Sequence, residues 1–394
     1  MRPRIMCDGV QWIGSIDWDR PLFDELIPLP DGTSYNAYLV TGSEKTAMID
    51  TVDPPKAAEL CAMLDASDVD RVDYIIANHA EQDHSGTLPM MMDRYPEAVL
   101  VCSPKARTML VELLGVSDAR IMTVADGETI SLGDLTLQFM HAPWVHWPET
   151  MLTYVPERKL LFSCDLFGAH LATSDLFASD PARVYRAAKR YFAEIMMPFR
   201  NHIEKHLEKL AGYEIEIIAP SHGPLHDSPD FILDAYRSWT LDAPRNKVVI
   251  PYVSMHGSTS VMVDRLISGL ADRGVVAVPY HISSGDTGRL AMELVDAATV
   301  VIGTPTVLSG AHPWAAYVAI LANALRPTVR FASIIGSYGW GGKAVEQLLS
   351  LVPNLKVEVL DPVIVKGYPG EADLAAIDNL ASSIASKHAD AGLT

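Results

Sequence analysis

Four potential metal ligands lie within six residues in the first quarter of the chain: His79, Glu81, Asp83 and His84. They follow directly on an apolar run, residues 72–77, that we expect to be a buried strand. A loop at this place can turn alternate side chains toward one point, and imidazole and carboxylate groups both bind divalent metals. A solvated polar loop is the alternative interpretation. The density of ligands favours a metal site, because two histidines among two acids rarely occur together by chance.

Three more candidate ligands are found downstream. His146 lies in the segment 143–149, Asp165 follows the apolar run 160–162, and His222 follows the run 215–218. Any one of them alone would more often be a hydrogen-bonded structural residue. Their joint placement after strands of one half of the chain predicts that they join the first four ligands at one site.

The chemical types of these seven residues limit the choice of metal. They comprise four imidazoles and three carboxylates, with no thiolate. This mixture, with an aspartate able to bridge, suits a dinuclear site of borderline-to-hard ions such as iron or manganese. A pair of zinc ions in a hydrolase stays open on these residues alone.

The sequence indicates a second kind of site, for a phosphate group, near residue 255. There, small and hydroxyl-bearing residues follow a predicted strand and precede a predicted helix. The segment is Ser254-Met255-His256-Gly257-Ser258-Thr259, which can present N–H groups and hydroxyls to a phosphate. It has neither the GxGxxG of dinucleotide sites nor the Gly-Lys-Ser/Thr of a Walker loop. A single terminal phosphate, as in FMN, therefore fits better. An ordinary loop with a capping Ser or Thr is the alternative.

Two later loops reinforce this interpretation. They are Thr304-Pro305-Thr306-Val307-Leu308-Ser309-Gly310 and Ser337-Tyr338-Gly339-Trp340-Gly341-Gly342. In a doubly wound parallel sheet both lie at the same edge as the phosphate loop, beside the point where the strand order reverses. Their glycines let the backbone approach a planar ring, and Tyr338 or Trp340 could stack on the ring or shield it. From these loops we expect flavin contacts at Thr304, Pro305, Thr306, Gly310 and residues 337–342.

The elements that must position these side chains fall into two halves. The first 240 residues contain short apolar runs bounded by turn residues, with helical patterns at 181–192 and 203–211. The runs predict strands at 38–40, 46–50, 74–77, 98–101, 135–140, 151–155, 160–162 and 215–218. A strand-rich α/β sandwich is consistent with this pattern.

A polar, proline-containing hinge at 241–246 separates a second half with regular alternation. Strands are predicted at 248–253, 275–280, 299–303, 330–335 and 356–360. Helices are predicted at 260–271, 288–297, 314–325, 343–351 and 372–387. Five βα units with nearly continuous apolar strands indicate a parallel, doubly wound sheet.

The pattern His79-x-Glu81-x-Asp83-His84, followed by His146, Asp165 and His222, resembles the metallo-β-lactamase-like domain of flavodiiron proteins (A-type flavoproteins). Zinc hydrolases of that fold usually carry His where this chain has Glu81, which favours the diiron branch. The segments 146–151 and 161–168 also resemble the family, and the three loops of the second half resemble its flavodoxin domain.

The resemblance implies a metallo-β-lactamase-like αββα sandwich with a diiron site at 1–245 and a flavodoxin-like, FMN-binding domain at 246–394. It covers nearly the whole chain, with no rubredoxin or flavin-reductase module, as in the simplest class of the family. By resemblance one iron takes His79, Glu81 and His146, the other takes Asp83, His84 and His222, and Asp165 bridges both. His222 is preferred to His226 because its Pro-Ser-His-Gly setting matches the family pattern. His141 and His170 are expected to lie outside the ligand set.

Composition limits the partners and the compartment. The chain has 394 residues, with 31 Lys+Arg against 49 Asp+Glu and a net charge of −18. Such a surface repels phosphate backbones and anionic lipid, so nucleic acid and membranes are poor partners. The four cysteines form no CxxC pair, no signal peptide is visible, and the longest apolar stretch, 315–325, is too short to span a bilayer. We expect a cytoplasmic protein.

The expected function is reduction of dioxygen to water, of nitric oxide to nitrous oxide, or of both, at the diiron site. Two ferrous ions and a reduced flavin hold the four electrons that dioxygen needs. An external carrier, such as rubredoxin or a reduced deazaflavin coenzyme, would supply them through FMN. Trp147 and Tyr35 are candidate walls of the pocket.

Two other functions are kept as alternatives: a dinuclear-zinc hydrolase with an accessory flavodoxin-like module, and an electron-transfer flavoprotein with a structural metal. The resemblance also implies a head-to-tail homodimer, or a dimer of such dimers, in which one chain's FMN faces the partner's metals.

Overall fold

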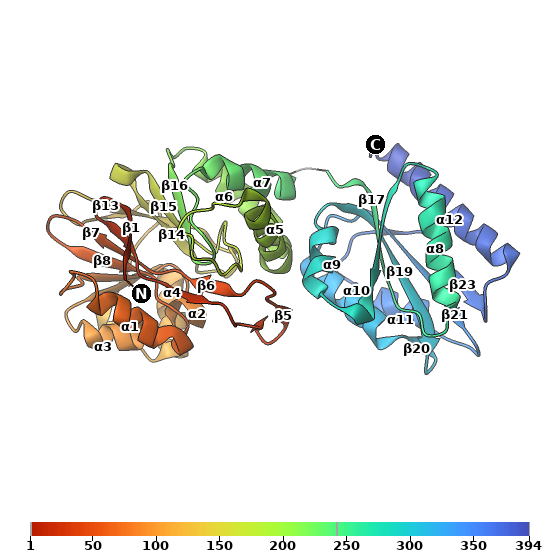
Figure 1. Ribbon diagram of the computed structural model, residues 1–394, viewed down its shortest axis with the longest axis horizontal. Coiled ribbons are helices and arrows are strands. Elements are labelled where there is room, and N and C mark those ends of the chain that lie inside the picture. Colours follow the sequence, from red (N-terminus) through yellow and green to blue (C-terminus); the bar gives the residue numbers. More distant parts are fainter. Residues whose placement is uncertain (1, 242, 394) are drawn as a thin grey trace. The chain divides into compact units, whose positions relative to one another are not determined.

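The computed structural model describes residues 2–241 and 243–393. Met1, Asp242 and Thr394 lie outside the described residues, and with them the outer ends of the two predicted domains and one position of the predicted hinge. The chain forms two compact units, one made of Met1–Phe192 with Phe199–Thr240 and the other of Ala193–Pro198 with Leu241–Thr394 (Figure 1).

The first unit contains two mixed sheets. The larger sheet has the order β1 (Arg4–Cys7), β2 (Val10–Trp12), β7 (Tyr38–Thr41), β8 (Thr46–Ile49), β9 (Tyr74–Ala77), β10 (Val99–Cys102) and β11 (Ile121–Thr123). The smaller sheet has the order β12 (Thr129–Ser131), β13 (Thr136–His141), β14 (Met151–Val155), β15 (Leu160–Cys164) and β16 (Ile217–Pro220). In each sheet, antiparallel pairing gives way to parallel pairing toward one end, at β8–β9 and at β15–β16.

The core of this unit lies between the two sheets. Fully buried side chains from both sheets pack in one cluster, including Leu39 and Ile75 from the larger sheet and Leu137 and Phe162 from the smaller one. Figure 1 shows helices on the outer sides of the two sheets. On one side these are α1 (Ala57–Asp65), α3 (Leu88–Arg94) and α4 (Pro104–Leu114), and on the other α5 (Pro181–Tyr191), α6 (Arg200–Leu210) and α7 (Pro229–Leu241). The unit is therefore a four-layer αββα sandwich.

Two small hairpin-like pairs and a short helix complete the first unit. β3 (Ser15–Asp17) pairs with β6 (Thr33–Tyr35), and β4 (Leu22–Phe23) pairs with β5 (Ile27–Pro28). The one-turn helix α2 (Gln82–Ser85) follows β9.

The second unit contains one parallel sheet with the order β18 (Val276–His281), β17 (Arg245–Tyr252), β19 (Ala297–Val307), β21 (Phe331–Tyr338) and β22 (Glu358–Val359). β20 (Gly310–Ala311) pairs with the end of β19, and β23 (Val363–Lys366) pairs with the second half of β21. The first strand lies between the second and the third, which is the 2-1-3-4-5 order of flavodoxin-like sheets.

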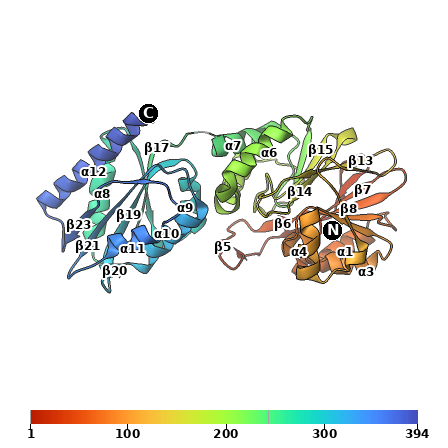
Figure 2. The same cartoon turned by 180° about the vertical axis from the view of Figure 1, so that it is seen from behind.

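Helices cover both faces of this sheet (Figure 2). α8 (Ser258–Ala271) and α12 (Glu371–Asp390) pack on one face, and α9 (Thr287–Leu294), α10 (Pro313–Leu325) and α11 (Ala344–Ser350) on the other. The five βα units expected from the sequence are thus present. The predicted fifth strand, 356–360, is present only as β22, and a further strand, β23, follows Asp361-Pro362, where proline provides no N–H for the ladder.

None of the helices within the described residues combines the length and the hydropathy that crossing a bilayer requires.

Candidate metal centre and phosphate-binding loops

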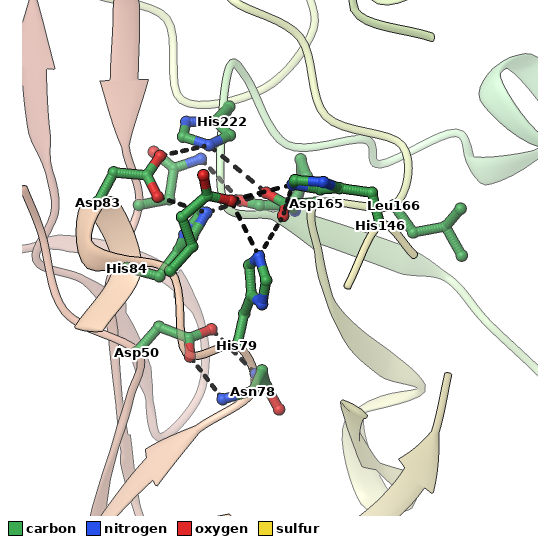
Figure 3. A network of polar contacts seen from close by, with 12 residues as sticks. Asp50, Asn78, His79, Asp83, His84, His146, Asp165, Leu166 and His222 are labelled. Carbon is green, nitrogen blue, oxygen red and sulfur yellow. Dashed lines mark hydrogen bonds and ion pairs between the residues drawn. The ribbon is translucent and has the colours of Figure 1, made fainter. Parts of the chain in front are cut away.

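The seven predicted metal ligands converge on one buried cluster in the first unit. Figure 3 labels all of them except Glu81. They come from four loops that the sandwich brings together. His79 and Glu81 follow β9, Asp83 and His84 lie on α2, His146 lies between β13 and β14, Asp165 follows β15, and His222 follows β16.

Local features of the backbone fix the conformation of two of these loops, the one after β15 and the one after β9. At the end of β15 the register shifts between Phe162 and Cys164, and Cys164 has a left-handed φ of 51°. Bulges of this kind re-aim the next side chain, here Asp165. At the end of β9, Asp50 accepts hydrogen bonds from the backbone N (2.7 Å) and Nδ2 (3.0 Å) of Asn78, which holds the start of the ligand loop. Burial raises the pKa of Asp50 to about 6, although His84 and these hydrogen bonds oppose the shift.

The first ligand group comprises His79, Glu81 and His146. The Nε2 atoms of His79 and His146 lie 3.1 and 3.0 Å from Glu81 Oε2. The same two nitrogens lie 3.4 and 3.6 Å from Oδ2 of Asp165. Two imidazoles and two carboxylates thus face a common point.

The second ligand group comprises Asp83, His84 and His222. The Nε2 atom of each histidine lies 3.2 Å from an oxygen of Asp83. Asp165 Oδ1 lies 3.0 Å from His84 Nε2 and 3.5 Å from His222 Nε2. Asp165 therefore turns one oxygen to each group, which is the placement that a bridging carboxylate requires.

The residues present fit a pair of divalent cations. Both carboxylate oxygens of Asp83 and of Asp165 are buried and have no hydrogen-bond donor among the described residues. Buried carboxylates that lack donors need a compensating positive charge. Metal ions placed between them and the facing imidazole nitrogens would supply it.

The histidine pKa values show the same demand for positive charge. Burial alone would lower the pKa of His222, but the carboxylates of Asp165 and Asp83, which lie 3.5 and 3.2 Å from its Nε2, raise it to about 10. The charges of Asp165 and Asp83 likewise outweigh burial and raise the pKa of His84. Protons and metal ions compete for these nitrogens, so the same facing carboxylates that raise the two pKa values would also stabilise a metal ion.

The other histidines named from the sequence lie outside both groups. His226 Nε2 contacts the carbonyl of Phe167 at 3.3 Å, and its backbone pairs with Ile218. Burial lowers the pKa of His226 to about 4. His141 Nε2 contacts the carbonyl of Val124 at 2.9 Å, and His170 Nδ1 contacts Thr33 Oγ1 at 2.9 Å.

The two predicted pocket walls do lie beside the cluster. The ring centroids of Trp147 and His79 lie 5.1 Å apart, and those of Tyr35 and His222 lie 5.8 Å apart. One residue of this site went unassigned from the sequence. Glu149 contacts Nδ1 of His79 at 2.7 Å, and only its position in the segment 143–149 beside His146 could have drawn attention to it.

In the second unit the predicted phosphate loop borders a cavity of about 170 Å³. Its lining residues are Ser254, Met255, His256, Ser258, Thr259, Pro305, Thr306, Ser337, Tyr338, Gly339 and Gly367. An adjoining cavity of about 410 Å³ is lined by residues that include Tyr338, Gly341 and Gly342. Three loops therefore meet at one edge of the sheet, as expected.

The first cavity fits a phosphate group. Thr259 lies in the first turn of α8, is buried, and has no partner for Oγ1 among the described residues. Gly257 precedes the helix with a φ of 92°, which favours glycine. An unpartnered hydroxyl beside free N–H groups of a helix N-terminus is the donor set that a phosphate accepts.

Four predicted flavin contacts, Gly257, Thr304, Gly310 and Trp340, do not line either cavity. Thr304 is buried, and its hydroxyl accepts from the N–H of His312. Gly310 packs against Gln347, and Trp340 is 73% exposed. Gly367 lines the first cavity but went unassigned, since it follows the unexpected strand β23.

Comparison with known proteins agrees with this architecture. A family model described as "ODP family beta lactamase" matches residues 33–223. The chain is 35% identical to the nitric oxide reductase of Moorella thermoacetica, over 99% of this chain and 100% of that protein. It is 32% identical to the rubredoxin-oxygen oxidoreductase of Megalodesulfovibrio gigas, over 98% of each.

Comparison with solved structures shows similarity to proteins of the same kind. The rubredoxin oxygen:oxidoreductase from Desulfovibrio gigas superposes with a TM-score of 0.93 at 31% identity over 98% of both chains. The flavodiiron protein from Giardia intestinalis gives 0.92 at 29% identity over 98% of this chain and 96% of that one.

Fold and site together define a two-domain oxidoreductase that joins a metallo-β-lactamase-like unit to a flavodoxin-like unit. The chain belongs to the flavodiiron (type A flavoprotein) family. This membership confirms the predicted fold class and the predicted cofactors, FMN and a diiron centre. It also decides the question that the ligands alone left open, in favour of an iron oxidoreductase over a zinc hydrolase.

Proposed function

We propose that this protein reduces dioxygen to water, nitric oxide to nitrous oxide, or both, with electrons that arrive through FMN from an external donor. The position of Asp165 between two ligand groups of equal composition carries the proposal, because it makes one buried site for two ions. Relatives named nitric oxide reductase and rubredoxin-oxygen oxidoreductase support it.

In the proposed site, His79, Glu81 and His146 hold one iron, Asp83, His84 and His222 hold the other, and Asp165 bridges them. Together the irons and FMN supply a binding place for a diatomic gas and up to four electrons. All four imidazoles present Nε2 to the carboxylates. For His222 the other nitrogen, Nδ1, donates to the carbonyl of Ser34 at 2.7 Å, which sets the tautomer that leaves Nε2 free to bind metal.

Trp147 and Tyr35 form walls that exclude water from the cluster. The hydroxyl of Tyr35 hydrogen-bonds to the carboxylate of Asp53, which pairs with Arg20 at 3.0 Å. Held in this way, the Tyr35 ring stays against His222 and limits access to small molecules.

We assign the diiron site to a domain at 1–245 and FMN to a domain at 246–394. In the FMN domain, the hydroxyl of Thr259 and the N-terminus of α8 hold the phosphate, and the loops that end at Pro305-Thr306 and Ser337-Tyr338-Gly339 border the ring. The electron donor is a rubredoxin or a reduced deazaflavin coenzyme, in line with relatives named rubredoxin-oxygen oxidoreductase and coenzyme F420H(2) oxidase. We also infer a cytoplasmic location.

We further propose that the chain works as a head-to-tail homodimer, alone or paired again into a dimer of dimers. Residues 1–245 carry a net charge of −16, whereas residues 246–394 carry −2. Like-charged surfaces repel, so pairing an acidic domain with the nearly neutral domain of a second chain is favoured over pairing two acidic domains.

The test uses full-length protein purified without oxygen and loaded with iron and FMN. With chemically reduced rubredoxin, an oxygen electrode and a nitric oxide electrode should each record consumption that stops in Asp165→Ala. Loaded protein that consumes neither gas with any reduced carrier would instead support a plain electron-transfer role. Colourless protein that contains zinc would support a hydrolase.

A further inference from the structure

The two metal positions have direct ligands of the same chemical types. Each has two imidazoles and one carboxylate of its own, Glu81 in one and Asp83 in the other, and both share Asp165. This inference rests on the proposed diiron centre. Because the direct ligands are so alike, the groups behind them are a main source of difference between the two positions.

Those groups differ among the histidines. His79 Nδ1 lies 2.7 Å from Glu149 Oε1, and both side chains have no exposed surface. His222 Nδ1 instead meets a neutral acceptor, the carbonyl of Ser34. His84 Nδ1 has no hydrogen-bond partner among the described residues. Within the part of the chain that the structure describes, His79 is the only one of the four ligand histidines with a hydrogen bond from Nδ1 to a carboxylate, since no such bond joins His146 Nδ1 to one.

Glu149 is held firmly and acts as an acceptor. Its Oε1 accepts from the backbone N–H of Ala80 at 3.0 Å as well as from His79. Its own carbonyl accepts from Ser103 Oγ at 2.6 Å, and Ser103 also caps α4. Two N–H donors thus converge on one oxygen of Glu149, and a negative charge on this carboxylate strengthens both hydrogen bonds.

A carboxylate that accepts the Nδ1 proton makes the imidazole more basic at Nε2, the atom that faces the metal position. We propose that Glu149 makes the two metal positions unequal, so that the ion held by His79, Glu81 and His146 binds more tightly and is the last to leave. In this inference Glu149 is a positioning residue that tunes the donor strength of His79.

An alternative is that Glu149 only orients the ring. Glu149→Gln separates the two roles, because glutamine Oε1 can accept from both N–H groups while the negative charge is removed. The new Nε2 takes the place of Oε2, which has no partner in the structure.

The experiment measures Co²⁺ affinity in full-length variants that keep one position each, by competition with a chromophoric chelator. Asp83→Ala/His222→Ala keeps the position backed by Glu149, and Glu81→Ala/His146→Ala keeps the other. Adding Glu149→Gln should weaken Co²⁺ binding by about 10- to 100-fold in the first background. In the second background, the matched control, it should change binding by less than about twofold.

An equal loss in both backgrounds, or no loss in either, would overturn the inference. Wild-type protein that binds fewer than two Co²⁺ would overturn the diiron assignment itself, which is a different result. If a double variant does not fold, Mössbauer spectra of ⁵⁷Fe-loaded wild type and Glu149→Gln replace the comparison. A change confined to one of two ferrous doublets is expected, and a change in both or neither contradicts the proposal.

Discussion

At the scale of single residues, Asp165 has the most distinctive placement, since each of its oxygens faces a different ligand group. Asp165→Ala should therefore lower iron content at both positions, by at least about tenfold in affinity. His146→Ala should affect mainly one position, because Nε2 of His146 faces Glu81 and the oxygen of Asp165 that belongs to the same ligand group. Iron per chain, measured by plasma emission spectrometry, checks this. Two irons retained in Asp165→Ala would disprove the bridging role.

Alanine substitutions of the two histidines that follow β16, His222 and His226, should differ in their effects on iron content and on stability. His222→Ala removes a nitrogen that faces two carboxylates, so we expect loss of iron and activity. His226→Ala should keep iron but lower the free energy of unfolding by about 1–3 kcal/mol, since a buried partner of the Phe167 carbonyl is lost. Iron content and urea unfolding measure the two effects, and the reverse order would show that His226 is the ligand.

His226 also predicts a pH dependence of stability. Its pKa is about 4 in the folded protein and about 6.5 when unfolded, so the unfolded state binds the proton more readily below pH 6.5. Stability should therefore fall as the pH drops from 6.5 toward 4, by about 1.5 kcal/mol between pH 6.5 and 5 from this group. Urea unfolding of metal-free wild type and His226→Ala at pH 7 and 5 isolates this contribution. An identical pH dependence in both proteins would contradict it.

At the scale of elements, both sites lie where loops leave the carboxyl ends of strands. The N-terminus of α8 and the buried hydroxyl of Thr259 are the clearest case. Thr259→Asp places a like charge beside the FMN phosphate and should weaken FMN binding by at least about a hundredfold. Thr259→Val, which removes only a hydrogen bond, should cost about tenfold or less. Quenching of flavin fluorescence on titration measures both, and equal effects would place the phosphate elsewhere.

At the scale of the whole molecule, the proposed head-to-tail dimer permits a complementation test. One chain carries Asp165→Ala and lacks metals, and the other carries Thr259→Asp and lacks FMN. Each homodimer should be inactive, whereas a mixed dimer should regain one working pair, because the flavin of the first chain faces the metals of the second. Gas consumption by co-expressed, doubly tagged dimers is the measurement. Mixed dimers as inactive as the parents, with the intact sites loaded, would indicate that electrons pass within one chain.

The sequence by itself determined the features that depend on short spacing. Three such features are the ligands between His79 and His84, the loop before the helix at Thr259, and the alternation of strands and helices after residue 246. Each is a local pattern, and local propensity and periodicity can be recognised without knowledge of the fold. The strand β23 was not predicted because β22 and β23 are each too short to show periodicity.

Only the tertiary structure decided which distant side chains meet. His146, Asp165 and His222 lie on three loops, and their distances to the first four ligands depend on how two sheets pack. The same packing put His222 in the cluster and turned His226 to the carbonyl of Phe167, and it placed Glu149 behind His79. Such contacts follow from non-local burial and strand register, which no short window of sequence contains.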